Sequence, residues 1–152
     1  MSRAALALAF CAALVPVCAQ ALSCAPSSPA QAYEMADASA SGYSVVVGTF
    51  DFGASALPKS EAVVSAVLTG RALTKTGFSA PYSKQLRLEV SCAASWCGSV
   101  APDHPYLVFV EQADAGLTVA LGPCPTVVFP NPSPAVERAM TRCLTSARCD
   151  TN

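Results

Sequence analysis

Cysteine is the residue type that offers this chain most of its chemistry. Eight cysteines occur among the 152 residues. Cys11 and Cys18 lie in an apolar N-terminal stretch. The others follow it: Cys24, Cys92, Cys97, Cys124, Cys143 and Cys149. Six cysteines can all pair, and outside the reducing cytoplasm such a set is typical of disulfides, although the residues alone leave the pairing open.

A zinc site is the alternative use of these thiols. It would take Cys92, Cys97, Cys143 and Cys149. The last two are spaced more widely than the gaps of roughly two to four residues in structural zinc sites, and a compartment outside the cytoplasm favours oxidation of the thiols. We therefore favour disulfides and predict that the protein holds no metal ion and no cofactor.

General acid-base chemistry near neutral pH has little to work with in this chain. His104 is the only histidine, and it lies in the turn-like sequence Pro102-Asp103-His104-Pro105. Asp103 is next to His104 in the sequence, but this does not place its carboxylate where it would orient the imidazole ring for catalysis. No glycine-rich phosphate loop is present, and cysteines that can all pair offer no evident nucleophile. We predict that the protein is not an enzyme and that His104 is a solvated loop residue.

Residues 1–21 have the pattern of a cleaved export signal. Arg3 supplies the basic start, an apolar stretch follows, and Ala19 and Ala21 are the small residues that a signal peptidase accepts. The stretch is too short to cross about 30 Å of hydrocarbon, and no second run of about 20 apolar residues follows. We therefore predict cleavage after Ala21 and a secreted or periplasmic protein, beginning at Leu22, that does not span a membrane.

A lipoprotein signal is the alternative interpretation of the same region, because Cys18 and Cys24 lie near its end. Val17 precedes Cys18 where a small residue is expected, and Ala21 stands three residues before Cys24 where a leucine-like residue is usual. Neither cysteine is well placed for lipidation. The alanine-rich signal with one arginine favours a bacterial source.

The predicted mature chain, residues 22–152, has the length of a single domain. Eight basic and ten acidic residues remain in it, which gives a net charge of −2 with histidine neutral. Such a balance argues against general affinity for nucleic acid, so we predict no nucleic-acid partner.

Runs rich in β-branched residues, separated by turn residues, predict a β domain. We expect strands at Ser44–Phe52, Ala62–Thr74, Lys84–Cys92, Tyr106–Glu111 and Leu117–Leu121. Turns are expected at Leu57-Pro58, Gly77–Pro81, Pro102–Pro105 and Ala115-Gly116. Five short strands without long helices between them predict an antiparallel sandwich or a small barrel.

Two helical segments flank these strands. Gln31–Asp37 is expected to form a short helical turn. Near the C-terminus, Ser133 can cap a helix and Pro134 suits its first position. An apolar stripe follows at Val136, Ala139, Met140, Cys143 and Leu144. This stripe has to pack on the strands.

Several short motifs also follow one another in a particular order. They are Ser23-Cys24-Ala25-Pro26, Pro29-Ala30-Gln31-Ala32-Tyr33, Ala36-Asp37, Val45-Val46-Val47-Gly48, Cys97-Gly98, Pro105-Tyr106-Leu107-Val108 and Cys124. With this order and spacing, over roughly residues 22–145, the chain resembles the tissue inhibitors of metalloproteinases and the netrin-like modules. The resemblance implies a five-stranded OB-type β-barrel stapled by disulfides, and the strand count agrees with it.

The resemblance also implies a disulfide pairing. In the inhibitors the first residue is a cysteine that pairs with the one in the Cys-Gly step. This chain has Leu22 there, so Cys97 needs another partner, and Cys92 is available. Glu34 stands where the inhibitors have a further cysteine, so the last two cysteines pair with each other. The implied pairs are Cys24–Cys124, Cys92–Cys97 and Cys143–Cys149.

Metalloprotease inhibition is one function that the resemblance implies. The inhibitors chelate the catalytic zinc of the protease through the amine and carbonyl of their first residue. Leu22 offers the same backbone atoms, with Ser23 following it toward the substrate pocket. Because Leu22 lacks the disulfide that holds those atoms in place, we expect this inhibition to be weak or absent.

A second candidate site combines basic and aromatic residues. No acidic residue lies between Ala62 and Leu88, and this stretch holds Arg71, Lys75, Phe78, Tyr82, Lys84 and Arg87. The two aromatics are expected in a loop over residues 76–82. On an OB-type barrel such a set can hold an anionic glycan or envelope component. The alternative is a solvated strand face beside aromatics that fold back on the core.

Trp96, between Cys92 and Cys97, leaves a similar choice open, because its ring either packs on the disulfide or is an exposed contact residue. Taken together, these residues predict an exported, non-catalytic binding or inhibitory module. Its partner would be a protein or an anionic envelope or glycan ligand. A purely structural envelope protein is the alternative.

Overall fold

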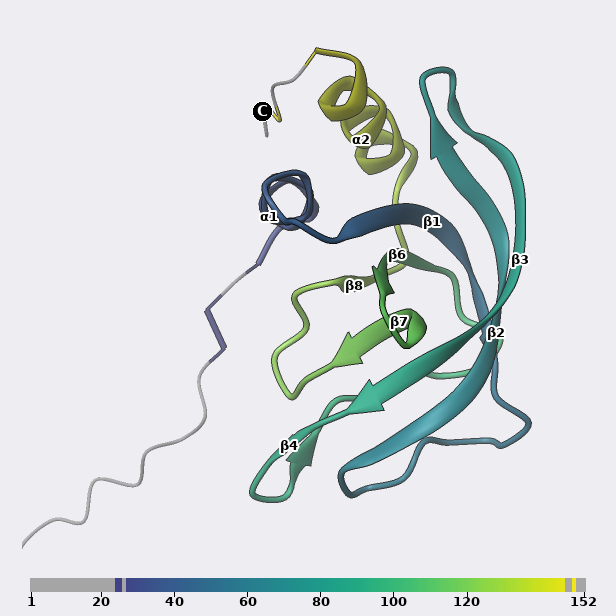
Figure 1. The fold of residues 1–152 in the computed structure, drawn as a ribbon, viewed down its shortest axis with the longest axis vertical. Helices are drawn as coiled ribbons and strands as arrows, with labels where there is room; N and C mark the ends of the chain where they lie inside the picture. The colour runs from purple at the N-terminus through teal and green to yellow at the C-terminus, as the bar shows by residue number, and fades with distance from the viewer. Residues whose placement is uncertain (1–23, 26, 147–148, 150–152) are drawn as a thin grey trace, which may run out of the picture.

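The computed structural model describes residues 24–25, 27–146 and 149. The predicted export signal, residues 1–21, lies outside the described residues, as do Leu22 and Ser23. Figure 1 shows a strongly curved sheet with two helices, α1 and α2, on one side of it. None of the helices within the described ranges has the length and apolar character needed to cross a membrane.

The helices and strands follow one another in a simple order along the chain. α1 spans Pro29–Asp37, β1 Gly42–Asp51, β2 Ala62–Thr74, β3 Gly77–Val90, β4 Cys92–Ala93 and β5 Trp96–Cys97. They are followed by β6 at Tyr106–Ala113, β7 at Gly116–Leu121, β8 at Val128–Pro130 and α2 at Pro134–Ser146. The expected strand over Ala62–Thr74 therefore has the predicted bounds. β3 begins seven residues before the expected Lys84, and the other ends of the expected strands differ by at most two residues.

Five of the strands close into a barrel. β1 and β3 each pair antiparallel with β2, and β6 pairs antiparallel with both β1 and β7. β3 and β7 pair in parallel over Arg87–Val90, which completes the ring, and β8 lies beside β6. This order is that of an OB-type barrel, so the predicted fold class, an all-β barrel with a C-terminal helix and disulfides, is confirmed.

One face of each barrel strand fills the interior. In β2, Ala66 and Leu68 are buried, whereas Ser65 and Val67 are exposed. The same core cluster contains Val46, Phe50, Leu88, Val108, Val110 and Val119. Alternation with a period of two residues is what a strand requires when only one face meets a closed core.

A second apolar cluster lies between the barrel and the helices. β6 is buried over all of Tyr106–Val110, because one face lines the barrel and the other lies under α1 and α2. On the outer side, Leu107 and Phe109 belong to one cluster with Met140 of α2 and Ala32 of α1. α1 therefore packs on β6 and β1, and α2 packs on α1, β2 and β3, with apolar side chains of both helices in one cluster.

The start of each helix agrees with its sequence. α1 is longer than the predicted turn because Ser28 caps it, with its hydroxyl accepting a hydrogen bond from the Gln31 backbone nitrogen at 3.2 Å. α2 begins as predicted, with the Ser133 hydroxyl accepting from the Val136 nitrogen at 3.3 Å.

The prediction that the whole apolar stripe of α2 packs on the strands is wrong at Leu144, whose exposed fraction is 37%.

The predicted turn at Gly77–Pro81 is wrong, and so is the predicted loop over residues 76–82. Residues 77–82 belong to β3, and the reversal of the chain falls between Thr74 and Gly77. A β-bulge in this hairpin then pairs Leu73 with Phe78 after Ala72 has paired with Ala80. The extra residue moves Phe78 to the outer face of the sheet, where it is buried in the cluster with α2.

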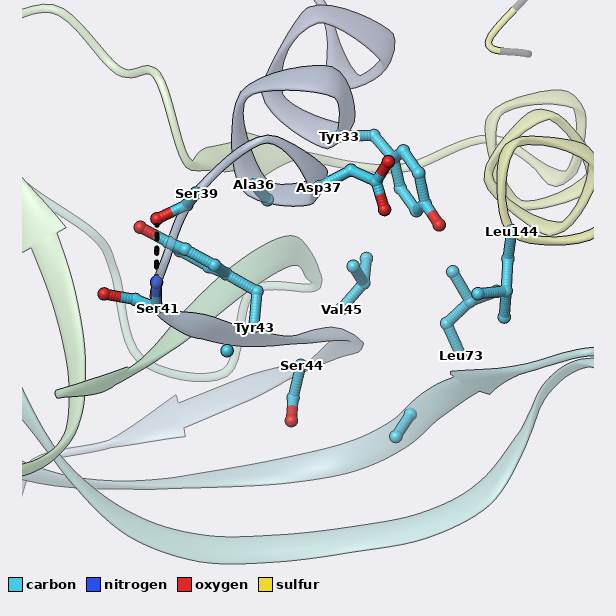
Figure 2. Close-up of a pocket in the computed structure, with 12 residues that line it drawn as sticks. Tyr33, Ala36, Asp37, Ser39, Ser41, Tyr43, Ser44, Val45, Leu73 and Leu144 are labelled. Carbon is cyan, nitrogen blue, oxygen red and sulfur yellow. Dashed lines mark hydrogen bonds between the residues drawn. The ribbon is translucent and has the colours of Figure 1, made fainter. Parts of the chain in front are cut away.

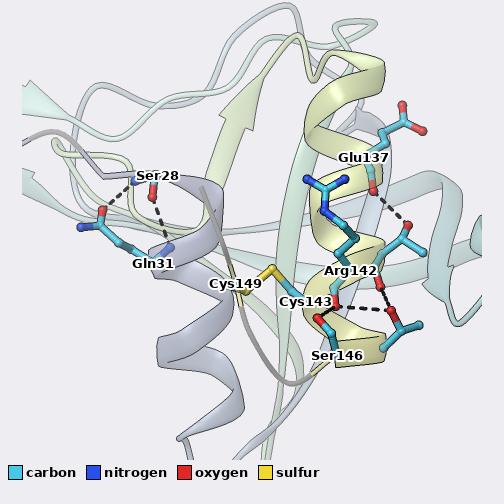
Figure 3. Close-up of a disulfide and its surroundings, with 9 residues drawn as sticks. Ser28, Gln31, Glu137, Arg142, Cys143, Ser146 and Cys149 are labelled. Atoms are coloured by element: carbon cyan, nitrogen blue, oxygen red, sulfur yellow. Dashed lines mark hydrogen bonds between the residues drawn. A yellow bond between two sulfur atoms is a disulfide. The ribbon is translucent and has the colours of Figure 1, made fainter. Parts of the chain in front are cut away.

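Three disulfides staple the fold: Cys24–Cys124, Cys92–Cys97 and Cys143–Cys149, with sequence separations of 100, 5 and 6. They are the pairs that the resemblance implies. The four cysteines of the zinc alternative are therefore bonded in pairs. Figure 3 shows the last disulfide, which ties the chain after α2 back to that helix, with α1 alongside it.

Candidate binding site

Two of the disulfides lie in segments that follow the paired ends of β3 and β7, at one end of the barrel. Cys92 and Cys97 are cross-strand partners in the small hairpin β4–β5, which directly follows β3 and projects from the lower end of the barrel in Figure 1. Cys24 is bonded to Cys124, which follows β7, with the two Cα atoms 5.4 Å apart. We call residues 24–25, 91–98 and 121–124 the disulfide rim.

Backbone contacts hold the two parts of the disulfide rim together. The Ser91 nitrogen donates to the Leu121 carbonyl at 2.9 Å, and the Gly98 nitrogen donates to the Ser91 carbonyl at 3.0 Å. Gly98 fits so closely that a β-carbon on it would collide with the Leu121 carbonyl oxygen. Since Leu121 leads directly to Cys124, the hairpin and the N-terminal segment rest on the same short stretch of chain.

Trp96 is the most exposed large apolar side chain of the disulfide rim. Its exposed fraction is 66%, and it pairs with Ala93 in the hairpin. The structure therefore shows an exposed ring, and a ring buried on the disulfide is not what forms here. The disulfide closes a hairpin of six residues and restricts its backbone. The exposed Trp96 ring is therefore attached to a rigid segment.

The N-terminal segment lies against the chain at Cys124 and Pro125. The Ser27 hydroxyl donates to the Pro125 carbonyl at 2.6 Å, next to the Cys24–Cys124 disulfide. Leu22 and Ser23, the residues that would chelate a protease zinc, lie outside the described residues. The structure thus describes the anchor of the N-terminus and leaves the chelation hypothesis as a prediction from the sequence.

The two arginines of the second candidate site each lie near an acidic side chain, and they are far from each other. Arg71 donates to the Phe78 carbonyl at 3.1 Å and lies 3.8 Å from a carboxylate oxygen of Glu137 in α2. Arg87 lies 3.5 Å from Glu89. Arg71 faces Pro81 across the hairpin, so six residues of strand, roughly 20 Å, separate it from Arg87.

The remaining members of that site also diverge. Lys75 lies in the turn between β2 and β3, and Lys84 is exposed on β3. Phe78 is buried against α2, whereas Tyr82 packs against the barrel core. The Tyr82 hydroxyl oxygen is buried without a hydrogen-bond partner among the described residues, and burial raises the pKa of this tyrosine. The structure does not gather these side chains on one face.

His104 lies where a loop residue was expected. It is exposed, between β5 and β6, with its ring centroid 6.2 Å from that of Tyr106. Asp103 next to it has a positive φ of 58°. Within the described ranges, no group of three or more His, Cys, Asp or Glu side chains could hold a metal ion.

The sequence did not predict a pocket that opens between α1, β1 and the end of α2 (Figure 2). Its cavity volume is about 370 Å³. Tyr33 and Asp37 of α1, Tyr43 of β1, Leu73 of β2 and Leu144 of α2 contribute to its lining. α1 and β1 are neighbours in sequence, but Leu73 and Leu144 come from distant elements, so no local pattern could have indicated the complete pocket.

Comparisons with known proteins add no family to this description. No protein-family model, curated protein or solved structure matches the chain.

Proposed function

We propose that this protein is an exported, non-catalytic module that binds a protein partner, in an inhibitory or other capturing role, through the disulfide rim. Three disulfides support the exported location, because such bonds persist outside the reducing cytoplasm. The predicted export signal adds to this argument from the sequence.

The observation that carries the proposal is the exposure of Trp96 on a cross-linked hairpin. Burying an indole ring at an interface is worth more than burying most other side chains, and tryptophan is enriched among the residues that dominate binding energies. A hairpin that is closed by Cys92–Cys97 and seated on Leu121 through Gly98 loses little conformational entropy on binding. Exposure and rigidity together favour a contact residue.

A protein partner fits these features better than an anionic glycan. The basic side chains do not converge, and Arg71 and Arg87 each have an acidic neighbour. A glycan would need several positive charges on one face to gain comparable affinity. A single protruding aromatic ring instead suits an apolar recess on a protein surface.

Site-specific photo-cross-linking tests the proposal. Trp96 is replaced by the photoreactive residue benzoylphenylalanine, the protein is exported by the cell that makes it, and the sample is irradiated. Met35 on α1, with an exposed fraction of 64% against 66% for Trp96, is the matched control position.

We expect a discrete protein adduct from position 96 and none from position 35. An excess of the unmodified protein should suppress the adduct, whereas the Trp96→Ala variant should not. The absence of any adduct specific to position 96 would contradict the proposal and favour the purely structural alternative.

A further inference from the structure

The pocket between α1, β1 and α2 has an unbalanced electrostatic character. Among the described residues that line it, Asp37 is the only one with a formal charge. Asp37 is also the last residue of α1, and the last turn of that helix contains no basic residue. The C-terminal end of a helix carries the negative end of the macrodipole, which a cation normally offsets. Here the Asp37 carboxylate and the C-terminal end of the helix dipole are both negative, and both lie at the pocket.

An aromatic ring lies beside that carboxylate. Tyr33 and Asp37 are four residues apart on α1 and therefore share one face of the helix. Figure 2 shows both side chains leaving α1 on the same side, toward α2, with the Asp37 carboxylate next to the Tyr33 ring. Burial and the neighbouring Asp37 charge raise the pKa of Tyr33, which agrees with their closeness. A cation in contact with both groups would gain an ion pair and a cation–π interaction.

The far end of the pocket repeats this combination. Tyr43 lines it, and Glu111 is the register partner of Tyr43 across the β1–β6 pair. Burial first, and then the Glu111 charge, raise the pKa of Tyr43. No lysine, arginine or histidine is among the described lining residues. Asp37 in the lining and Glu111 beside Tyr43 are therefore two negative charges near the pocket, and no described lining residue carries a positive charge.

Apolar side chains form another wall of the pocket. Val45, Leu73 and Leu144 line the pocket together with Ala36 and Ala72. Leu144, the residue of the α2 stripe that does not pack on the strands, instead forms part of this wall. Apolar walls with one carboxylate suit a ligand whose positive charge is carried by carbon-bearing groups rather than by a hydrated metal ion.

We propose that this pocket binds a small organic ammonium ion, with the charged head between Tyr33 and Asp37 and its methyl or methylene groups against Leu73 and Leu144. A volume of about 370 Å³ is enough for such a ligand. The proposal is independent of the disulfide rim, which belongs to another part of the barrel.

Titration of the purified exported protein with choline tests this site, followed by NMR chemical shifts or calorimetry. The neutral isostere 3,3-dimethylbutan-1-ol, which has the same shape without the charge, is the ligand control. We expect saturable choline binding that weakens with added salt, and at least roughly fivefold weaker binding of the isostere.

Two pairs of variants locate the charge and the ring. Asp37→Asn should weaken choline binding at least roughly fivefold, whereas Glu34→Gln, an exposed carboxylate on the same helix that does not line the pocket, should leave it unchanged. Tyr33→Phe should retain most of the affinity and Tyr33→Leu should lose it.

Three outcomes would overturn the proposal. They are the absence of saturable binding, equal binding of choline and its neutral isostere, and an Asp37→Asn variant that binds choline like the wild type while remaining folded by circular dichroism. Because purified protein and a pure ligand are used, these outcomes are distinguishable from a failure of the proposed partner binding.

Discussion

Gly98 and Leu121 approach each other so closely that only a residue without a side chain fits at position 98. A β-carbon built there would overlap the Leu121 carbonyl oxygen and carbon and crowd the Gly122 nitrogen. This approach seats the Trp96 hairpin on the stretch of chain that leads to Cys124. The arrangement of the disulfide rim therefore depends on one glycine.

Gly98→Ala should destabilise the protein by about 2 kcal/mol or more, because the added methyl group meets backbone that cannot move aside. The free energy of unfolding in urea measures the effect. Gly42→Ala is the matched control, since the nearest atom to its β-carbon is Gln112 Cδ at 3.4 Å, and we expect a change within about 0.5 kcal/mol there. Similar losses in the two variants would show that the close approach is not formed.

The three disulfides should differ in their contribution to stability. Replacing Cys24 and Cys124 together by alanine releases a loop of 100 residues and should lower the free energy of unfolding by about 4.7 kcal/mol. Replacing Cys143 and Cys149 releases a loop of 6 and should cost about 2 kcal/mol by the same chain-entropy relation, apart from any loss of packing around buried Cys143. Equal losses in thermal or urea unfolding would refute the entropic account.

Tyr82 should make the fold sensitive to alkaline pH. Its pKa is raised by burial above the ordinary value of 10.0, so the folded state favours the neutral phenol more than the unfolded state does. The resulting stabilisation is fully present below pH 10.0 and is lost as the pH rises through the folded-state pKa.

Tyr82→Phe cannot ionise and also removes a buried hydroxyl that has no partner among the described residues. We expect its stability at neutral pH to equal or exceed that of the wild type by up to about 1 kcal/mol, with a smaller loss in alkaline solution. The urea midpoints of the wild type and of Tyr82→Phe, at neutral and at alkaline pH, measure both effects. A less stable variant at neutral pH would mean that the hydroxyl is hydrogen-bonded.

Extension of the N-terminus distinguishes zinc chelation from other modes of binding. Adding one residue before Leu22, or acetylating its amine, removes the chelating group and should leave the unfolding transition unchanged. Because Leu22 has no disulfide, we expect the native N-terminus to inhibit zinc peptidases weakly or not at all. Tight inhibition that is lost on extension would contradict this expectation and favour the inhibitor interpretation.

The sequence predicted the barrel strands well because they are runs rich in β-branched residues between turn residues. The run Ala62–Thr74 predicted β2 with its observed bounds. The bulge after Ala72 escaped detection, since one extra residue changes the face of Phe78 without changing composition. Pro81 added to the error, because proline is read as a turn residue. It is tolerated here in a part of β3 that pairs with β2 and not with β7.

The candidate sites were predictable only in part. The disulfide pairs followed from the resemblance, and the position of Trp96 between two bonded cysteines identified it as a contact candidate, while its exposure required the structure. The basic and aromatic residues were close in sequence, but strand geometry sends Phe78 and Tyr82 to different clusters. The pocket beside Asp37 depends on how α1 and α2 pack, which no local pattern encodes.

The affinity of the cross-linked partner for a set of variants tests the proposed function most directly. Calorimetry with purified protein gives the dissociation constant for the wild type, Trp96→Ala, the Arg71→Ala and Lys75→Ala double variant, and the chain extended before Leu22. We predict that Trp96→Ala weakens binding by about 30-fold or more, as expected for an interfacial tryptophan, and that the other changes stay within about threefold. Wild-type affinity in Trp96→Ala, together with a large loss in the double variant that depends on salt, would contradict the account and place the contact on β2 and α2 instead.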